Sequence, residues 1–409
     1  MKRTIFLIML LLSIPSFAGG YRVALQGARM LGMAHAGVSV FNSAETAFFN
    51  PSGIAFLEGD NQFSFGLSLV VSHVKYQNAQ WLWTAQTHNP IGTPFYAYFT
   101  HKIDDRFSMG MALYTPYGST VEWDKDWVGS HLVNKISLKA IYLQPSLTYK
   151  INEYMSVGVS FIAATGSVYY NKNINRFMQD ADGNRTDITL EAEGVTGAGY
   201  ALSFSVRPSD RVALGVNYRS KVIFNARYGK AEINDNPGYL PPKDNFKSSL
   251  PMPAELSMGF SWKVTDKWLI AVDLNETYWS VYKSLDTDFY IFPDNKMPKN
   301  WQNTFTYRFG TQYDVNDRWQ VRAGYYFDQS PIPATYFSPD TPSLDSHNYT
   351  FGLTYKKGKW SVDAAFLYVN GLERTDSYDY YVEGLSAPRF DGTYVSNAFV
   401  PSFGVNYSF

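Results

Sequence analysis

Apolar and polar residues alternate along most of the chain from about residue 62 onward. In 154–162 and 256–262, an apolar residue such as Met, Val, Leu, Phe or Trp alternates with Ser or Gly. In 321–328 the alternate positions include Arg322 and Asp328. A period of two is typical of β-strands whose two faces lie in different environments. The pattern therefore predicts an all-β protein.

The connections between these segments are of two kinds. Short turns lie at 103–105, 151–153, 208–210, 265–266, 315–317 and 357–358, and long polar loops lie around 78–92, 117–131, 173–187, 233–247, 286–300, 329–345 and 374–395. Six turns and seven loops connect fourteen strands. Short turns on one side and long loops on the other are typical of outer-membrane barrels. We predict a 14-stranded antiparallel transmembrane β-barrel over residues 61–409, with both of its ends on the short-turn, periplasmic side.

The last predicted strand supports a membrane barrel over the alternative, a soluble β-sandwich. Residues 401–409 place Phe403, Val405, Tyr407 and Phe409 on one face. An aromatic residue at the C-terminus is the usual assembly signal of bacterial outer-membrane barrels, and a soluble sandwich does not need one. We therefore expect Phe409 to be recognised by the barrel assembly machinery. We expect the surroundings of a monomeric barrel to be outer-membrane lipid and lipopolysaccharide.

Composition and the first residues agree with this location. The chain has 31 Tyr, 29 Phe and 10 Trp, as expected of a barrel with aromatic girdles at both membrane interfaces. Residues 1–18 have a basic start, an apolar run and a small-x-small end, which predicts a secretory signal and a mature chain that begins at Gly19. The absence of Cys excludes disulfides and thiolate metal sites, and the net charge of −1 gives no indication of nucleic-acid binding. We expect no cofactor and no metal.

Residues 19–60 fit neither the barrel pattern nor a long helix. Their most apolar part, 45–57, reads ETAFFNPSGIAFL and is broken at Asn50-Pro51. Fourteen strands enclose far more space than eight, whose inward side chains already fill a small barrel. We therefore predict that 19–60 form a plug, or hatch, inside the lumen.

The chain resembles the FadL family of outer-membrane transporters of long-chain fatty acids and other hydrophobic compounds. The resemblance rests on the order and spacing of five motifs, at 31–37 (LGMAHAG), 50–53 (NPSG), 114–129 (YTPYGSTVEWDKDWVG), 218–220 (YRS) and 327–333 (FDQSPIP). It implies passive transport of a hydrophobic molecule, with long-chain fatty acids as the first choice of ligand. It also implies a gating hatch, whose residues would be Gly32, Gly37, Asn50, Pro51 and Ser52.

A kinked third strand that opens the barrel wall is also implied by the resemblance. The residues give an independent reason to expect one, because Pro116-Tyr117-Gly118 interrupts an alternating segment. Pro cannot donate to a sheet ladder, and Gly permits the backbone angles of a bulge. Pro116 could instead simply begin an extracellular loop.

Several charged residues lie on predicted inward faces. We expect Arg219, Arg308, Arg322 and Asp328 to form a network in the lumen, because charges facing lipid are costly. The resemblance further assigns Arg176 and Lys299 to the ligand's carboxylate, with Lys296 as a competing choice for Lys299.

One loop departs from the family pattern. The loop 178–187 is short and polar, so capture of the ligand could instead use Trp81 and Trp83, or Tyr239-Leu240-Pro241-Pro242. Uptake of neutral or aromatic hydrocarbons and a general porin remain alternatives. A barrel enzyme such as a phospholipase is not expected, since none of the six His residues has Ser two positions away.

Overall fold

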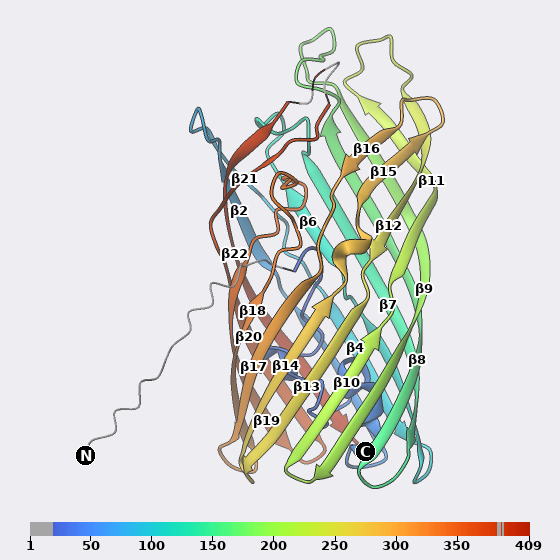
Figure 1. Ribbon diagram of the computed structural model, residues 1–409, viewed down its shortest axis with the longest axis vertical. Helices are drawn as coiled ribbons and strands as arrows, with labels where there is room; N and C mark the ends of the chain where they lie inside the picture. The colour runs from blue at the N-terminus through green and yellow to red at the C-terminus, as the bar shows by residue number, and fades with distance from the viewer. Residues whose placement is uncertain (1–18, 383–385, 387) are drawn as a thin grey trace, which may run out of the picture.

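The computed structural model describes residues 19–382, 386 and 388–409, so the expected signal at 1–18 lies outside the described part of the chain. The described strands form a closed antiparallel barrel (Figure 1). Closure occurs between the first and last strands, since Phe65 lies opposite Val405. As predicted, fourteen strands make up the wall, several of them divided into shorter segments.

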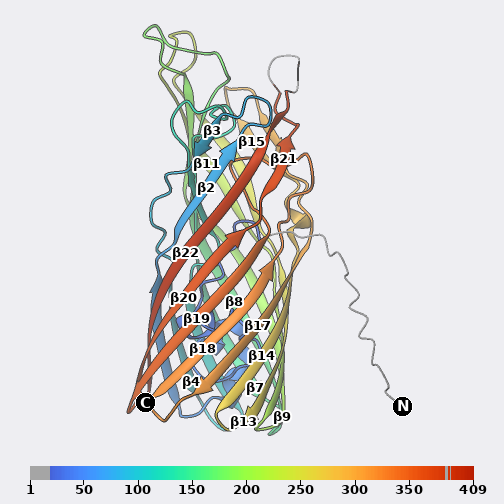
Figure 2. The ribbon, with the colours of Figure 1, turned by 90° about the vertical axis from the view of Figure 1, so that its left-hand side faces the viewer.

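The wall contains twenty-two segments. They begin with β1 (Asn61–Ser68), β2 (Val71–Gln77), β3 (Thr84–Gln86), β4 (Phe95–Lys102), β5 (Phe107–Tyr114), β6 (Gly118–Glu122), β7 (Lys135–Lys150), β8 (Met155–Asn173), β9 (Asp187–Ser209), β10 (Val212–Arg219) and β11 (Val222–Asn234). They continue with β12 (Lys243–Met252), β13 (Glu255–Thr265), β14 (Trp268–Thr277), β15 (Ser284–Phe289), β16 (Asn295–Pro298), β17 (Thr304–Asp314), β18 (Trp319–Asp328), β19 (Ser346–Lys357), β20 (Trp360–Gly371), β21 (Arg374–Tyr378) and β22 (Phe390–Ser408). Figure 2 shows β22 between β2 and β20, with which it pairs.

The six predicted short turns all lie between consecutive strands, at the end of the barrel that holds the C-terminus (Figure 1). The long loops were predicted less well. β3, β6, β15, β16 and β21 lie partly or wholly within stretches read as loops, because their polar residues show little apolar alternation. The extracellular side of the barrel is therefore taller than the sequence pattern indicated.

The two faces of the wall differ as the alternation predicted. On β1, Phe63 and Phe65 are 40% and 45% exposed, whereas Ser64 between them is fully buried in the lumen. A barrel in lipid needs this apolar outer face because no water is present there to solvate polar groups. None of the helices in the described residues is long and apolar enough to cross a membrane.

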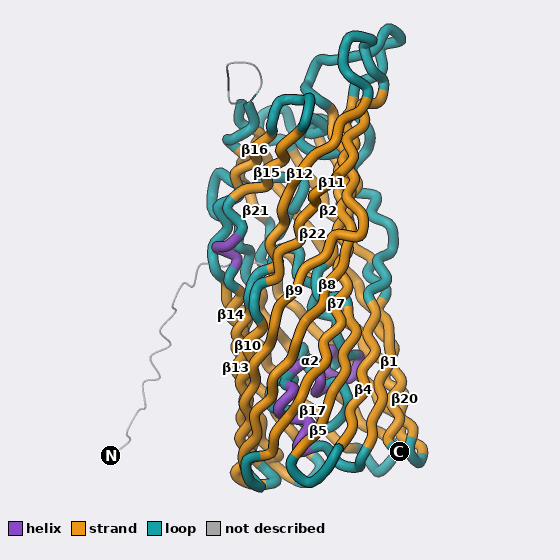
Figure 3. The backbone as a smooth tube through the Cα atoms, turned by 90° about the vertical axis from the view of Figure 1, so that its right-hand side faces the viewer, coloured by secondary structure: helices purple, strands orange, loops and turns teal. Residues whose placement is uncertain are grey.

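The N-terminal residues 19–60, called the inner segment from here on, lie inside the barrel. They contain α1 (Ala28–Leu31), α2 (Thr46–Phe49) and the 3₁₀ helix η1 (Pro51–Phe56), which Figure 3 shows as the helices enclosed by strands. η1 packs against β5, β7, β8 and β9. Small inward residues of the wall leave room for the inner segment: a Cβ on Gly158 of β8 would lie 2.8 Å from the backbone N of Ser52, and one on Gly352 of β19 would lie 2.9 Å from the Cα of Gly32.

The inner segment carries a buried carboxyl group, Glu45, just before α2. Its two oxygens accept hydrogen bonds from the backbone N–H groups of Arg29 and Met30, at 3.2 and 3.0 Å. Arg29 also forms an ion pair with Asp363 of β20, with its Nε atom 3.4 Å from Oδ2. Burial, and secondly the negative charge of Asp363, raise the pKa of Glu45 from 4.5 to about 7.

We expect this carboxyl group to make the packing of the inner segment depend on pH. Glu45 holds its proton more tightly when buried than when exposed, so packing is most stable below pH 4.5 and weakens as the pH rises towards about 7. Hydrogen–deuterium exchange of residues 28–49, corrected for intrinsic rates, should show less protection at pH 8 than at pH 5. Glu45→Gln should remove most of that difference, and a Gln variant with unchanged pH dependence would assign the effect to another group.

Candidate functional site

An apolar cavity lies in the lumen above the inner segment, on the side of the long loops. Its open volume is about 80 Å³. Its lining includes Ile136, Leu138, Val168, Leu190, Phe224 and Phe246, which come from β7, β8, β9, β11 and β12. Lys172, near the extracellular end of β8, is the charged residue among its described lining residues. A lining of this polarity suits an apolar molecule with a small polar group.

The first residues of the inner segment form one boundary of this cavity. Tyr21 lines it and packs edge-on against Trp279, with ring centroids 4.7 Å apart. The Tyr21 hydroxyl donates to the carbonyl of Pro251 at 2.6 Å, where the wall is irregular between β12 and β13. Movement of the inner segment at Tyr21 would therefore change the shape of the cavity.

A long loop closes the cavity from the extracellular side. Residues 329–345 connect β18 to β19 and fold into the upper lumen (Figure 1). Phe337 and Asp340 of this loop are fully buried, and Thr341 lines the cavity. The indole N–H of Trp123 donates to the carbonyl of Pro339 at 3.1 Å, which ties the loop to the opposite wall.

The predicted ligand residue Lys299 has an internal partner. Its Nζ lies 2.7 and 2.9 Å from the two carboxylate oxygens of Asp340, and both side chains are buried. Burial would raise the pKa of Asp340, but the Lys299 ammonium and its hydrogen bonds hold that pKa below its ordinary value. The competing Lys296, on β16, is exposed.

Arg176, the other predicted ligand residue, contacts a different group of side chains. Its Nη2 lies 3.3 Å from Nε2 of His131, and its guanidinium lies 5.9 Å from the ring centre of Tyr381. Burial, and secondly the charge of Arg176, lower the pKa of His131 to about 3, so its imidazole is neutral. Arg176 does not belong to the described lining of the apolar cavity, whereas Lys172 does.

The strand is irregular around Pro116, between β5 and β6. Regular pairing with β7 stops after Tyr114 and resumes at Gly118, and between them the carbonyl of Tyr117 still accepts from Ala140 N of β7 at 3.2 Å. The inner segment takes up the freed backbone groups, since Val23 N donates to the carbonyl of Pro116 at 2.8 Å. Gly118 N donates to the carbonyl of Tyr21 at 3.1 Å.

Charged residues beside this interruption bind the inner segment to the wall. Arg22 pairs with Glu255 at 2.8 Å and with Asp328 at 3.2 Å, so Asp328 contacts a residue that the sequence analysis did not single out. Arg219 lies 3.9 Å from Glu255 and donates to the carbonyl of Phe48 at 3.0 Å.

Two further predicted lumen residues hold other parts of the inner segment and wall. Arg308 donates to the carbonyl of Ala34 at 3.0 Å. Arg322 lies 3.7 Å from Asp363, which also receives Arg29. The predicted lumen charges therefore lie in separate clusters, each completed by residues that the alternation alone did not distinguish from other inward polar positions.

The Asn50-Pro51-Ser52 motif is fully engaged with the wall. The Asn50 amide donates to the carbonyl of Val38 at 2.8 Å, and its oxygen accepts from the Ser52 hydroxyl at 2.6 Å. The Ser52 N–H donates to Ser203 Oγ at 2.9 Å, and its carbonyl accepts from Ser156 Oγ at 2.8 Å. The motif thus connects two stretches of the inner segment and fixes them to β8 and β9.

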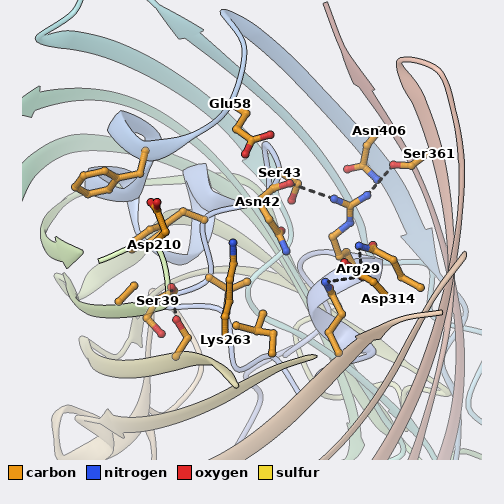
Figure 4. A pocket seen from close by; sticks show the side chains of 18 of the residues that line it. Arg29, Ser39, Asn42, Ser43, Glu58, Asp210, Lys263, Asp314, Ser361 and Asn406 are labelled. Atoms are coloured by element: carbon orange, nitrogen blue, oxygen red, sulfur yellow. Dashed lines mark hydrogen bonds between the residues drawn. The ribbon is translucent and has the colours of Figure 1, made fainter. Parts of the chain in front are cut away.

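A second cavity, below the inner segment, is polar. It has a volume of about 420 Å³ and opens at the short-turn end of the barrel, among side chains such as Glu58, Asp210 and Lys263 (Figure 4). Arg29 reaches into it and donates to Ser361 Oγ at 2.7 Å. The inner segment therefore separates an apolar space from a polar one.

The chain is similar to a described family of outer membrane proteins and to several of its members. The family described as "Outer membrane protein transport protein (OMPP1/FadL/TodX)" matches residues 9–409. A putative outer membrane protein of Neisseria meningitidis serogroup B is 25% identical and covers 95% of this chain and 96% of its own length. The "Long-chain fatty acid transport protein" of Salmonella typhi is 25% identical over 67% of this chain and 69% of its own length.

Solved structures share the same fold. A Pseudomonas aeruginosa FadL homologue superposes with a TM-score of 0.85 at 21% identity, covering 96% of this chain and all of that one. The Pseudomonas putida toluene transporter TodX gives a TM-score of 0.71 at 18% identity, covering 92% of this chain and 98% of its own. The chain therefore belongs to the OMPP1/FadL/TodX family of outer membrane transport proteins.

Proposed function

We propose that this outer-membrane protein carries long-chain fatty acids by passive diffusion. The observation that supports this most is the apolar cavity above the inner segment, with Lys172 in its wall and the Lys299–Asp340 pair beside it. An acyl chain fits the apolar lining, and a carboxylate suits a buried ammonium group. The names of curated relatives, such as the long-chain fatty acid transport protein of Salmonella typhi, agree with this ligand.

A neutral hydrocarbon is the second candidate ligand. Because Asp340 already neutralises Lys299, that lysine does not by itself require an anion. A solved structure of the same fold is a toluene transporter. A fatty acid carries a carboxylate and a hydrocarbon does not, so charge substitutions in the upper lumen distinguish the two ligand classes.

We further propose that the inner segment acts as the hatch and that the ligand leaves sideways through the wall. The polar lower cavity is a poor route for an apolar molecule. The interruption at Pro116–Gly118 lies beside Tyr21, which borders the apolar cavity. Withdrawal of residues 21–26 would connect that cavity with the interruption, and downhill partitioning into lipid would drive the step.

Deleting Asn50-Pro51-Ser52 should abolish uptake while leaving the barrel folded. The deletion removes the hydrogen bonds that fix η1 to β8 and β9, so the hatch loses its defined position. Uptake of a labelled fatty acid measures transport, and heat-modifiable migration on gels checks the fold. Planar-bilayer conductance should stay low for the wild type, as a hatch requires and a general porin does not. Full uptake by the deletion variant would remove the motif from the mechanism.

Restoring a regular strand at the interruption should seal the lateral route. Deletion of Tyr117 combined with Pro116→Thr returns a donor to the ladder and lets β5 continue into β6. Uptake should fall with no loss of folded protein. If uptake is unchanged, the ligand leaves through the periplasmic end.

Removing both predicted ligand cations should separate the two ligand classes. Arg176→Met with Lys299→Met should weaken fatty-acid binding at least about tenfold, since a hydrogen bond to a charged group contributes ~1.5–3 kcal/mol. Binding of an alkane of equal length should hardly change. The exposed Lys296→Met is the matched control. Retained fatty-acid affinity in the double variant would favour the hydrocarbon.

A further inference from the structure

The Lys299–Asp340 pair joins two parts of the protein with different constraints. Lys299 directly follows β16 and its backbone is fixed, since its N–H donates to the carbonyl of Lys283 at 2.8 Å. Asp340 lies within the seventeen-residue loop 329–345, which has no strand or helix of its own. If the pair separates, the loop is the partner that can move.

Asp340 offers Lys299 the same chemical group that a fatty acid would offer. Both of its oxygens face Nζ, at 2.7 and 2.9 Å, in a place that is closed to water. Two carboxylates cannot share one buried ammonium without repulsion, and a buried carboxylate left without a partner is costly. Binding of a ligand carboxylate to Lys299 would therefore expel Asp340 towards solvent.

The cavity brings such a competitor close to the pair. Thr341, the neighbour of Asp340, lines the apolar cavity, and so does Lys172. Lys172 has no ion pair to a described acidic residue, so two ammonium groups and one carboxylate border this region. The excess positive charge favours an entering anion and would lower the cost of exchanging one carboxylate for another.

We propose that Asp340 is an internal substitute for the ligand carboxylate: it holds Lys299, and with it the loop 329–345, until an anionic headgroup takes its place. The proposal rests on the proposed function, because it requires a ligand with a carboxylate. It makes Asp340 a specificity-determining residue. A neutral molecule of the same length cannot displace Asp340, so it would enter without releasing the loop.

Release of the loop would also reach the inner segment. Ser343 Oγ, three residues beyond Asp340, accepts a hydrogen bond from the backbone N–H of Gly20 at 3.0 Å. Gly20 precedes Tyr21, which borders the apolar cavity. Exchange of one carboxylate for another at Lys299 would therefore also weaken the hydrogen bond between Gly20 of the inner segment and Ser343 of the loop.

The loop position can be measured with a single thiol, because the chain has no Cys. Ser338→Cys places that thiol in the loop, at a side chain that is 1% exposed. In purified full-length protein it should react slowly with a bulky polar maleimide. A sixteen- to eighteen-carbon fatty acid should raise the rate several-fold, whereas the alcohol of the same chain should not. Ser160→Cys, buried on β8, is the control for general loosening of the barrel.

Asp340→Asn in the Ser338→Cys background tests, without any ligand, whether the Lys299–Asp340 pair holds the loop closed. Loss of the charged partner should raise the labelling rate, and it should tighten fatty-acid binding by about tenfold because Lys299 is already free. Asp345→Asn, at the end of the same loop and without an ion pair to a described residue, should change neither quantity. Heat-modifiable migration confirms that each variant is folded.

Two results would overturn the proposal. In the first, a fatty acid binds without changing the labelling rate of the Ser338→Cys thiol, and its affinity depends on Lys172 but not on Lys299. This result would place the headgroup at Lys172 with the loop closed. The other is an Asp340→Asn variant whose labelling and affinity match those of the Ser338→Cys parent. The third possible result is that the Ser338→Cys protein binds no fatty acid, but its loop opens when Asp340→Asn is added. That result would contradict the ligand class of the proposed function and would leave the role of the Lys299–Asp340 pair in holding the loop intact.

Discussion

A barrel of fourteen strands encloses more space than its own inward side chains can fill, and the rest of this structure follows from that constraint. The inner segment occupies part of the lower space and the loop 329–345 part of the upper space, with a cavity left beside each of them. Both carry backbone polar groups that must find partners away from bulk water. Inward Ser, Asn and Gly residues of the wall supply these partners and leave room for them, as Ser203 and Gly352 do.

Charge inside the lumen obeys the same requirement. Arg22, Arg219, Arg308 and Arg322 each contact a carboxylate or a backbone carbonyl across the interface between the inner segment and the wall, or within the wall. Removing one partner of such a pair leaves a buried charge without compensation, which is strongly destabilising. The inner segment is thus held in the lumen by specific ion pairs and hydrogen bonds to the wall.

The alternation of apolar and polar residues was sufficient to predict the barrel, because lipid outside and polar groups inside impose a period of two on each strand. It located the short turns and the interruption at Pro116. It did not identify Asp340 or Glu255 as partners, since an inward carboxylate looks the same in the sequence whether it meets Lys299, Arg22 or water. It also missed Lys172, because the alternation of buried and exposed residues breaks down in the last part of β8.

The circular pairing of the wall has a consequence for how the protein is assembled. The inner segment contacts strands around most of the circumference, from β4 and β5 to β20 and β22. Closure joins β1 to β22, the first strand made to the last. Helices of the inner segment contact strands on both sides of this closure, namely β1, β4 and β5 on one side and β20 and β22 on the other. These contacts can all form only when β1 has met β22, so docking of the inner segment and closure of the wall are coupled.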